Sequence, residues 1–340
     1  MVIGSADGPP RETFHDIRGA VTAVNGMIVV ADGGSSELRV FSGAGEFLGA
    51  FGRAGDGPRE FRRIAWIDMC GGEAVVAYDS RRHRITKWDT DGSLLDEFAV
   101  EGPGTALPPY RVSCGPSGTF AVIGWPDIFG VSLDLGPYRP NVAIGITDGR
   151  GRFERVIGEF PGQERIRTAN NDRPHPFGKS TMVRMGASGV YVATADSFAI
   201  DLVSTDGEHR TFGRDYAVTP LSRGMREQWV DAYLEKAPAE QRPSLKRSLL
   251  ESEWLPTVPP AYADLRIDRL GFLWASPYVI GNPGIAASVE WSVFDPGGMF
   301  VATVMVPSHF RPTEIGGDYV LGVSTDATDV QRVHRYTLSR

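Results

Sequence analysis

Short apolar runs separated by glycine-containing turns are the main pattern along this chain. Gly26 is followed by an apolar run at 27–32, a second run at 38–41 and a turn with two glycines at 42–45. The same order of runs and turns returns after Gly72. Runs this short, interrupted by glycine, are typical of strands in tight hairpins rather than of helices. The pattern therefore predicts a repeated unit of short antiparallel strands.

The spacing of this unit indicates how often it is repeated. One glycine marks the first turn of each unit, and these glycines are Gly26, Gly72, Gly118, Gly189, Gly271 and Gly317. They are 46, 46, 71, 82 and 46 residues apart, so the two longer spacings contain insertions. A period in the forties is the length of a four-stranded propeller blade, and six such units would close a ring. The sequence predicts an all-β, six-bladed β-propeller, a single domain over 1–340, with a small helical insertion at 219–258 between blades four and five.

The last unit is shorter than the others. It contains only three strand-like runs, at about 310–315, 319–323 and 330–338. We expect the segment near Val2 and Ile3 to supply the missing outer strand, because this would close the ring without an unpaired sheet edge. A frayed amino end beside an open last blade is the alternative.

Several stretches resemble known propeller families. Residues 30–32 and 38–41, with the glycine turn that follows, are similar to the NHL repeat. Residues 259–274, 291–297 and 318–323 are similar to largely uncharacterised bacterial six-bladed propeller proteins of the NHL/TolB-like kind, which are commonly exported. The resemblance implies the architecture of the blades and no particular chemistry.

The long insertions are predicted to share one face of the ring. Successive strands of a blade run antiparallel, so their connections alternate between two faces. The insertions are at about 125–140, 159–178, 214–261 and 277–287, and all of them fall in connections on the same face. Loops on a rigid scaffold usually carry the binding groups. This insertion face is therefore the predicted binding face.

The largest insertion is predicted to contain two helices, at 222–237 and 244–253. The first places Met225, Trp229 and Tyr233 on one side, and the second does the same with leucines. Their apolar sides either pack on each other and on the rim of the ring, or cover the central funnel as a lid.

Basic side chains stand near the point where each innermost strand leaves the insertion face. They are Arg18, Arg63, Arg111, Lys179, Arg266 and Arg311. If several of them converge on the axis, they would favour an anionic ligand such as a carboxylate or a phosphate. Separate, solvated or salt-bridged side chains are the alternative. Trp125 and Tyr138 lie next to prolines and suit a stiff pocket wall, and Tyr262 completes the predicted ligand-binding set.

Metal chemistry was considered because some six-bladed propellers are metal enzymes. The histidines near blade entrances are His15, His175 and His309. They resemble the zinc-binding histidines of amidating-lyase propellers, but their offsets from the turn glycines differ. Candidate calcium ligands, as in propeller lactonases, are Asp16, Asp68, Asp264 and Glu314. We expect no cofactor, and a divalent metal is the alternative.

Composition narrows the class of protein. The 340 residues are 41% apolar, enough for a large core, and the net charge of −7 supplies no basic field for nucleic acid. No apolar run is long enough to span a membrane, and the amino end lacks the features of a signal peptide. We expect a monomeric, mature periplasmic or extracellular protein, with a cytoplasmic one as the alternative. Cys70 and Cys114 are either two separate strand residues or one bridge between neighbouring sheets.

These patterns favour a non-catalytic binding module. It would present the insertion face and the central funnel to a peptide, a sugar or a small anionic molecule. A metal-dependent hydrolase or lyase at the mouth of the channel is the alternative. Converging histidine nitrogens or acidic oxygens would favour catalysis, and a cup lined by arginines or aromatic rings would favour binding.

Overall fold

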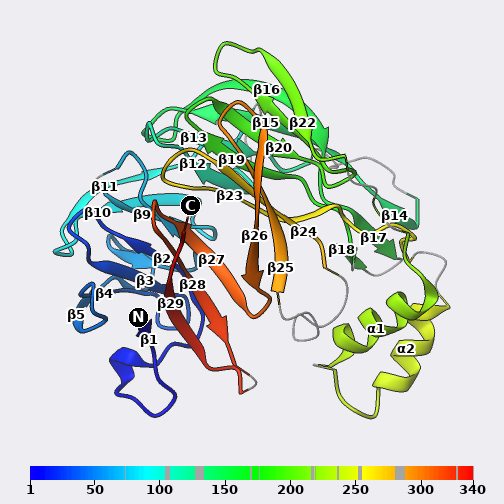
Figure 1. Ribbon diagram of the computed structural model, residues 1–340, viewed down its shortest axis with the longest axis horizontal. Helices are drawn as coiled ribbons and strands as arrows, with labels where there is room; N and C mark the ends of the chain where they lie inside the picture. Colours follow the sequence, from blue (N-terminus) through cyan, green and yellow to red (C-terminus); the bar gives the residue numbers. More distant parts are fainter. Residues whose placement is uncertain are drawn as a thin grey trace.

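The part of the chain that the structure describes forms six four-stranded antiparallel sheets (Figure 1). The computed structural model describes residues 1–72, 74–103, 108–126, 134–168, 171–175, 177–215, 218, 220–235, 237–251, 255–279, 288–326 and 328–339. The sheets are numbered here in chain order, from sheet one to sheet six.

Each of the first five sheets contains four strands in chain order, and in sheet three β14 is left out. Sheet one contains β2 (Ile17–Thr22), β3 (Ile28–Asp32), β4 (Glu37–Phe41) and β5 (Phe47–Phe51). Sheet two contains β8 (Ile64–Asp68), β9 (Val75–Asp79), β10 (Arg84–Trp88) and β11 (Leu94–Ala99). Sheet three contains β12 (Arg111–Cys114), β13 (Phe120–Ile123), β15 (Asn141–Thr147) and β16 (Phe153–Pro161). Sheet four contains β19 (Met182–Gly186), β20 (Gly189–Ala193), β21 (Ala199–Val203) and β22 (His209–Gly213). Sheet five contains β23 (Tyr262–Ile267), β24 (Leu273–Pro277), β25 (Ser288–Phe294) and β26 (Phe300–Pro307).

Sheet six combines the two ends of the chain. Its strands are β27 (Phe310–Ile315), β28 (Tyr319–Thr325), β29 (Gln331–Thr337) and β1 (Val2–Ile3). β1 pairs antiparallel with β29, with Val2 opposite His334 and Ile3 opposite Val333. The predicted contribution of the amino-terminal segment to the last blade is therefore confirmed.

Glycine turns join the first two strands of the sheets. The backbone angle φ is +80° at Gly26 and +88° at Gly271, a region that glycine enters without steric cost. We call the side of the ring that carries these turns the turn face. It lies opposite the insertion face, because the first and second strands of a sheet run antiparallel.

The second strand of each sheet is apolar on both sides because it is packed between neighbouring sheets. In β3, Val29 points to the boundary with sheet two, whereas Val30 points to the boundary with sheet six. The described residues form one buried apolar cluster at each of the six boundaries between successive sheets. The cluster between sheets six and one contains Phe41 and Leu321, among others, and closes the ring.

Two of the predicted insertions, those at 125–140 and 159–178, pair with each other, whereas most of 277–287 lies outside the described residues. β14 (Gly136–Tyr138) lies between β13 and β15, and it pairs with β17 (Arg165–Thr168), which pairs with β18 (Asn171–Pro174). These last two strands belong to the connection from sheet three to sheet four. Smaller elements are η1 (Pro10–Glu12) and the parallel pair β6 (Arg53–Ala54) and β7 (Glu60–Phe61).

Two helices lie between β22 and β23 in the chain. They are α1 (Arg223–Leu234) and α2 (Arg242–Leu250), and the predicted end of the second helix at 252–253 falls outside the described residues. Val230 and Leu234 of α1 are buried in a cluster with Phe177, and Tyr278 packs against it. Figure 1 shows the pair beside β17 and β18. The helices therefore pack on neighbouring insertions at the rim. No helix in the described ranges is long and apolar enough to cross a bilayer.

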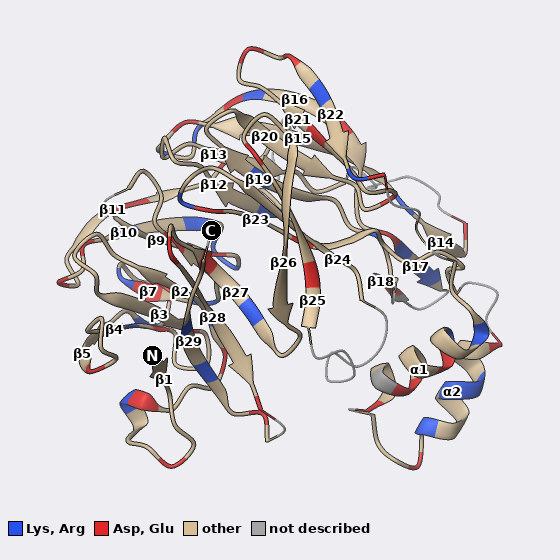
Figure 2. Cartoon of the chain, viewed as in Figure 1, with Lys and Arg blue, Asp and Glu red and all other residues tan. Residues whose placement is uncertain are grey.

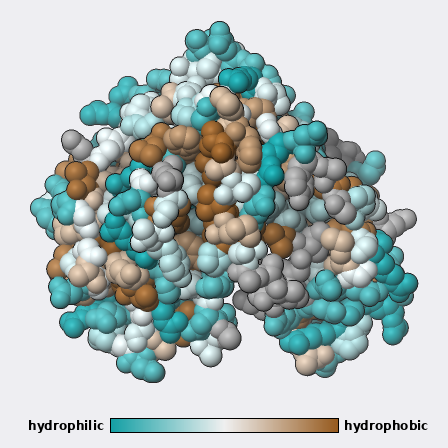
Figure 3. Space-filling model, viewed as in Figure 1, coloured by the Kyte–Doolittle hydropathy of each residue, from teal (hydrophilic) through white to brown (hydrophobic). Residues whose placement is uncertain are grey.

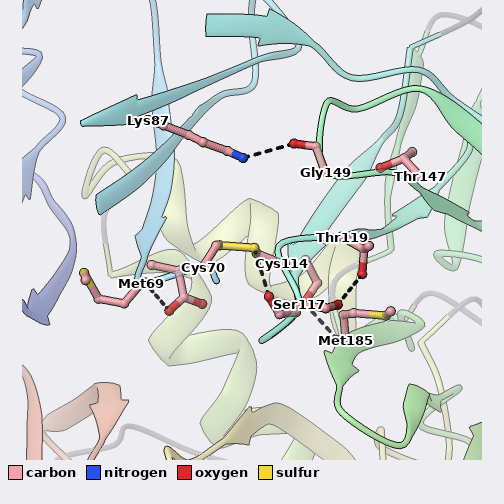
Figure 4. The surroundings of a disulfide bond; sticks show 12 residues. Met69, Cys70, Lys87, Cys114, Ser117, Thr119, Thr147, Gly149 and Met185 are labelled. Atoms are coloured by element: carbon pink, nitrogen blue, oxygen red, sulfur yellow. Dashed lines mark hydrogen bonds between the residues drawn. A yellow bond between two sulfur atoms is a disulfide. The ribbon is translucent and has the colours of Figure 1, made fainter. Parts of the chain in front are cut away.

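A disulfide joins sheets two and three at the turn face. Cys70 follows β8 and Cys114 ends β12, and their Cα atoms are 5.8 Å apart, a normal spacing for a disulfide. Figure 4 shows this bond together with a second link between the same sheets, in which Lys87 Nζ donates to the carbonyl oxygen of Gly149 at 3.0 Å. Of the two alternatives for the cysteines, the structure contains the bridge.

Positively and negatively charged residues are mixed along the chain (Figure 2), and hydrophobic residues are unevenly distributed over the surface (Figure 3). Acidic and basic segments are interspersed over strands and helices in Figure 2. Brown, apolar atoms gather near the middle of the view in Figure 3, and β26 exposes Phe300, Val301 and Met305. An attraction for a charged ligand must therefore come from a local cluster of side chains.

Candidate functional site

The axial channel is formed by the first strand of every sheet. These inner strands are β2, β8, β12, β19, β23 and β27. Each one starts at the insertion face, and neighbours such as β19 and β23, or β2 and β27, contact each other around the axis. Charged side chains on these strands therefore meet although they are far apart in the sequence.

Two arginines from different sheets share one carboxylate in the channel. Asp264 Oδ1 accepts a hydrogen bond from Arg184 Nη2 at 2.8 Å, and Asp264 Oδ2 accepts one from Arg266 Nε at 2.8 Å. Burial acts to raise the pKa of Asp264, but the two arginines outweigh it and lower that pKa. Asp264 therefore stays ionised and holds both guanidinium groups in place.

The surroundings of Arg184 are unfavourable for positive charge. Burial lowers its pKa to about 10, Asp264 opposes the shift, and the charges of Arg266 and Arg111 add to it. Arginine remains protonated at any physiological pH. The Arg184 guanidinium is therefore a desolvated positive charge with two other arginines close to it.

A second group lies where β27 meets β2. Arg311 Nη2 donates to the carbonyl oxygen of Ile17 at 2.8 Å, and Arg18 Nη2 lies 2.5 Å from Asp16 Oδ2. Burial lowers the pKa of Arg311, and nearby Arg266 lowers it further while Asp264 opposes the shift. Arg18 is the extra residue of a bulge in β2, a feature that can redirect a side chain.

The third group combines a cation with aromatic rings. Arg111 stacks over Tyr110, with 5.3 Å between its guanidinium carbon and the ring centre. Tyr110 packs edge-on against Trp125 at 4.9 Å, and its hydroxyl donates to Gln163 Oε1 at 3.2 Å. Trp125 is 42% exposed, so one side of this group is open to solvent.

Asp68 is the acidic residue at the turn-face end of the channel. The Asp68 side chain is exposed to solvent, as expected for a residue of a channel wall, although many protein atoms lie around it. This desolvation raises the pKa of Asp68, although Arg266, Arg184 and Arg269 act to lower it. Asp68 therefore takes up a proton at a higher pH than an ordinary aspartate does.

Positive charge exceeds negative charge among the charged side chains of the channel. The channel arginines are Arg18, Arg111, Arg184, Arg266 and Arg311. They come from sheets one, three, four, five and six, and they face the carboxylates of Asp16, Asp68 and Asp264. The channel can therefore accommodate an anion and neutralise it.

Four of the six predicted basic residues belong to this cluster, and two do not. Lys179 Nζ lies 3.0 Å from Asp196 Oδ1, which also binds Arg139. Arg63 is exposed, and its backbone amide donates to Asp79. Arg184 was missed, although it stands five residues before its turn glycine, the same offset as Arg266.

The predicted aromatic residues have different surroundings. Trp125 is in the aromatic group described above. The hydroxyl of Tyr138, in β14, donates to Asp172 Oδ2 at 2.5 Å, which places this ring in the three-stranded sheet of the insertion face. Tyr262 is 3% exposed and donates to the carbonyl oxygen of Phe198 at 2.7 Å, so it is part of the core between sheets four and five.

The histidines considered as metal ligands lie on separate segments. His15 is exposed beside Asp32, His175 is buried after β18, and His309 is exposed in the turn between β26 and β27. Within the described ranges, no three His, Cys, Asp or Glu side chains are grouped so that they could hold a metal ion.

The acidic residues considered as calcium ligands have basic neighbours. Asp16 pairs with Arg18, Asp264 pairs with two arginines, and Glu314 Oε1 lies 2.5 Å from Arg269 Nη2. Carboxylates neutralised in this way are poor ligands for a hard cation. The donor set of the channel fits an anion better than a metal ion.

Comparison with known proteins supports the fold. No curated protein matches the sequence. A family described as a 6-bladed beta-propeller matches residues 14–101. A Bacteroides fragilis structure named as an exported protein is 13% identical, with a TM-score of 0.53 over 100% of this chain and 95% of that chain. A duf4221 family member from Bacteroides vulgatus is 8% identical, with a TM-score of 0.52 over 100% and 97%.

A more distant likeness is to the virginiamycin B lyase of Staphylococcus aureus. It is 11% identical, with a TM-score of 0.46 over 100% of this chain and 88% of that chain, which is too low to support an inference. The two Bacteroides structures match the fold over the whole length of this chain, and the chain itself has six four-stranded sheets. The chain is a six-bladed β-propeller.

Proposed function

We propose that the protein is a non-catalytic binding propeller that holds a small anionic ligand in its axial channel, with access from the insertion face. The observation that carries the proposal is the convergence of the five channel arginines from five sheets around three carboxylates. Charged hydrogen bonds from arginine to a carboxylate or phosphate contribute about 1.5–3 kcal/mol each. A ligand that takes two or three of them would bind specifically.

The remaining features complete this proposal. We take the chain to be an NHL/TolB-like monomer in which the helical pair is an insertion between blades four and five. Peptides and sugars with acidic groups belong to the same ligand class. The metal-dependent hydrolase or lyase considered from the sequence is not proposed, because no described group of side chains suits that chemistry.

A location outside the cytoplasm fits the disulfide. Cys70 and Cys114 form a bond that persists in oxidising compartments and is rare in the cytosol. The B. fragilis protein of similar fold is named as exported. We therefore propose a periplasmic or extracellular location.

Calorimetric titration with citrate and with sulfate at low ionic strength tests the binding proposal. Wild-type protein should bind at least one of these anions, and Arg266→Gln and Arg311→Gln should each weaken binding by about tenfold or more, because each removes a charged donor. Arg150→Gln is the matched control, since Arg150 is exposed in the turn between β15 and β16. Equal binding by all four proteins, or no binding by the wild type, would count against the proposal.

A further inference from the structure

The channel arginines differ in whether a carboxylate neutralises them. Arg18 pairs with Asp16, and Arg184 and Arg266 share Asp264. Among the described residues, no carboxylate lies within ion-pair distance of Arg111 or Arg311. Arg111 stacks on Tyr110, and Arg311 donates only to a backbone carbonyl oxygen. These two guanidinium groups therefore retain donors and charge that no carboxylate of the described residues uses.

Arg111 and Arg311 lie on opposite walls of the channel. Arg111 is the first residue of β12 in sheet three, and Arg311 is the second residue of β27 in sheet six. In a closed ring of six sheets, the third and the sixth are separated by three steps in either direction. Both strands start at the insertion face, so the two residues also stand at a similar depth.

The side chains between them favour an extended anion. The charge of Arg111 lowers the pKa of Arg184, and the charge of Arg266 lowers the pKa of Arg311. Positive charge therefore continues from one wall to the other through sheets four and five. Asp264 fixes the two intermediate arginines by 2.8 Å hydrogen bonds. A single small anion at one wall would leave the opposite arginine without a partner.

On this basis, and resting on the anion-binding function proposed above, we propose that the ligand is a dianion with two separated acidic groups, one bound by Arg111 and the other by Arg311. A dicarboxylate joined by a short carbon chain is the simplest molecule of this class. The aromatic group of Tyr110 and Trp125 lies next to Arg111 and provides an apolar wall for the part of the ligand near that end.

The test compares dicarboxylates with the monocarboxylates that lack their second carboxyl group. Succinate, glutarate and adipate are titrated by calorimetry beside propionate, butyrate and pentanoate, each at constant ionic strength and pH 7.5. For the best chain length, the dicarboxylate should bind at least about tenfold more tightly than its partner, because it gains a second charged contact. In Arg111→Gln and in Arg311→Gln this advantage should fall to about twofold or less. Arg150→Gln should retain it.

The possible outcomes separate this inference from the function on which it rests. If monocarboxylates bind as tightly as dicarboxylates, or if both variants keep the dicarboxylate preference, the bridging dianion is refuted while the anion site stands. If no carboxylate binds to the wild type, the bridging dicarboxylate is refuted, and the anion site itself fails only if citrate and sulfate do not bind either. Thermal melting of each variant shows whether it is folded, and Arg111→Lys, which keeps the charge, should retain more of the preference than Arg111→Gln.

Discussion

Loss of the disulfide between sheets two and three is expected to destabilise the protein by about 4 kcal/mol. The bond joins residues that are 44 positions apart. Closing a loop of that length removes conformational entropy from the unfolded chain worth about 4 kcal/mol at 25 °C. Cys70 is buried between the two sheets, so serine at this position also places a hydroxyl among apolar side chains, at a smaller cost. The double variant Cys70→Ser/Cys114→Ser should therefore unfold at a clearly lower urea concentration.

Urea unfolding followed by tryptophan fluorescence measures this difference in the free energy of unfolding. Wild-type protein in reducing buffer is the matched control, because it lacks the bond but keeps both sulfur atoms. Its unfolding midpoint should fall close to that of the double variant. A double variant as stable as oxidised wild type would refute the reasoning, and titration of free thiols in unfolded wild type should detect none.

Three further changes test other parts of the molecule. Ile3→Ala should lower the free energy of unfolding by about 2–3 kcal/mol in urea melts, because Ile3 is 2% exposed in the cluster that closes the ring. Arg269→Gln should lower the free energy of unfolding by about 2 kcal/mol at pH 7 in the same assay, because it removes the ion-pair partner of Glu314. The loss should be smaller at pH 5, because burial raises the pKa of Glu314 and protonation of this residue stabilises the fold as pH falls. Sulfate affinity should rise, by up to about fivefold, as pH falls, because burial raises the pKa of Asp68 and its protonation removes a negative charge from the channel; Asp68→Asn should abolish this dependence in calorimetry.

The fold could be predicted from the sequence because every blade repeats the same local requirements. Each begins with an inner strand and a glycine turn, and its second strand is apolar on both sides, as in β3 and β9. The six turn glycines therefore reveal the number of blades, and the short last unit reveals the need for β1. The ends of the helices were less well defined, because α2 has no buried residue to mark its limits.

The candidate site was only partly predictable, because its side chains depend on register and on neighbouring sheets. Bulges shift the register of β2 and β23, so a fixed offset from the turn glycine does not select the channel side chains. Lys179 seemed suitable by position, but it pairs with Asp196 at the rim. Arg184 and Arg266 share Asp264 across two sheets, so the sequence of neither sheet alone indicates this contact.

The most direct test of the central claim is the position of an anion in crystals soaked with selenate, located by the anomalous scattering of selenium. An anion-binding channel predicts a selenium peak within hydrogen-bonding distance of the Arg266 and Arg311 guanidinium groups, and the loss of that peak in crystals of Arg266→Gln. Peaks confined to the outer surface of the ring, with none in the channel, would contradict the account.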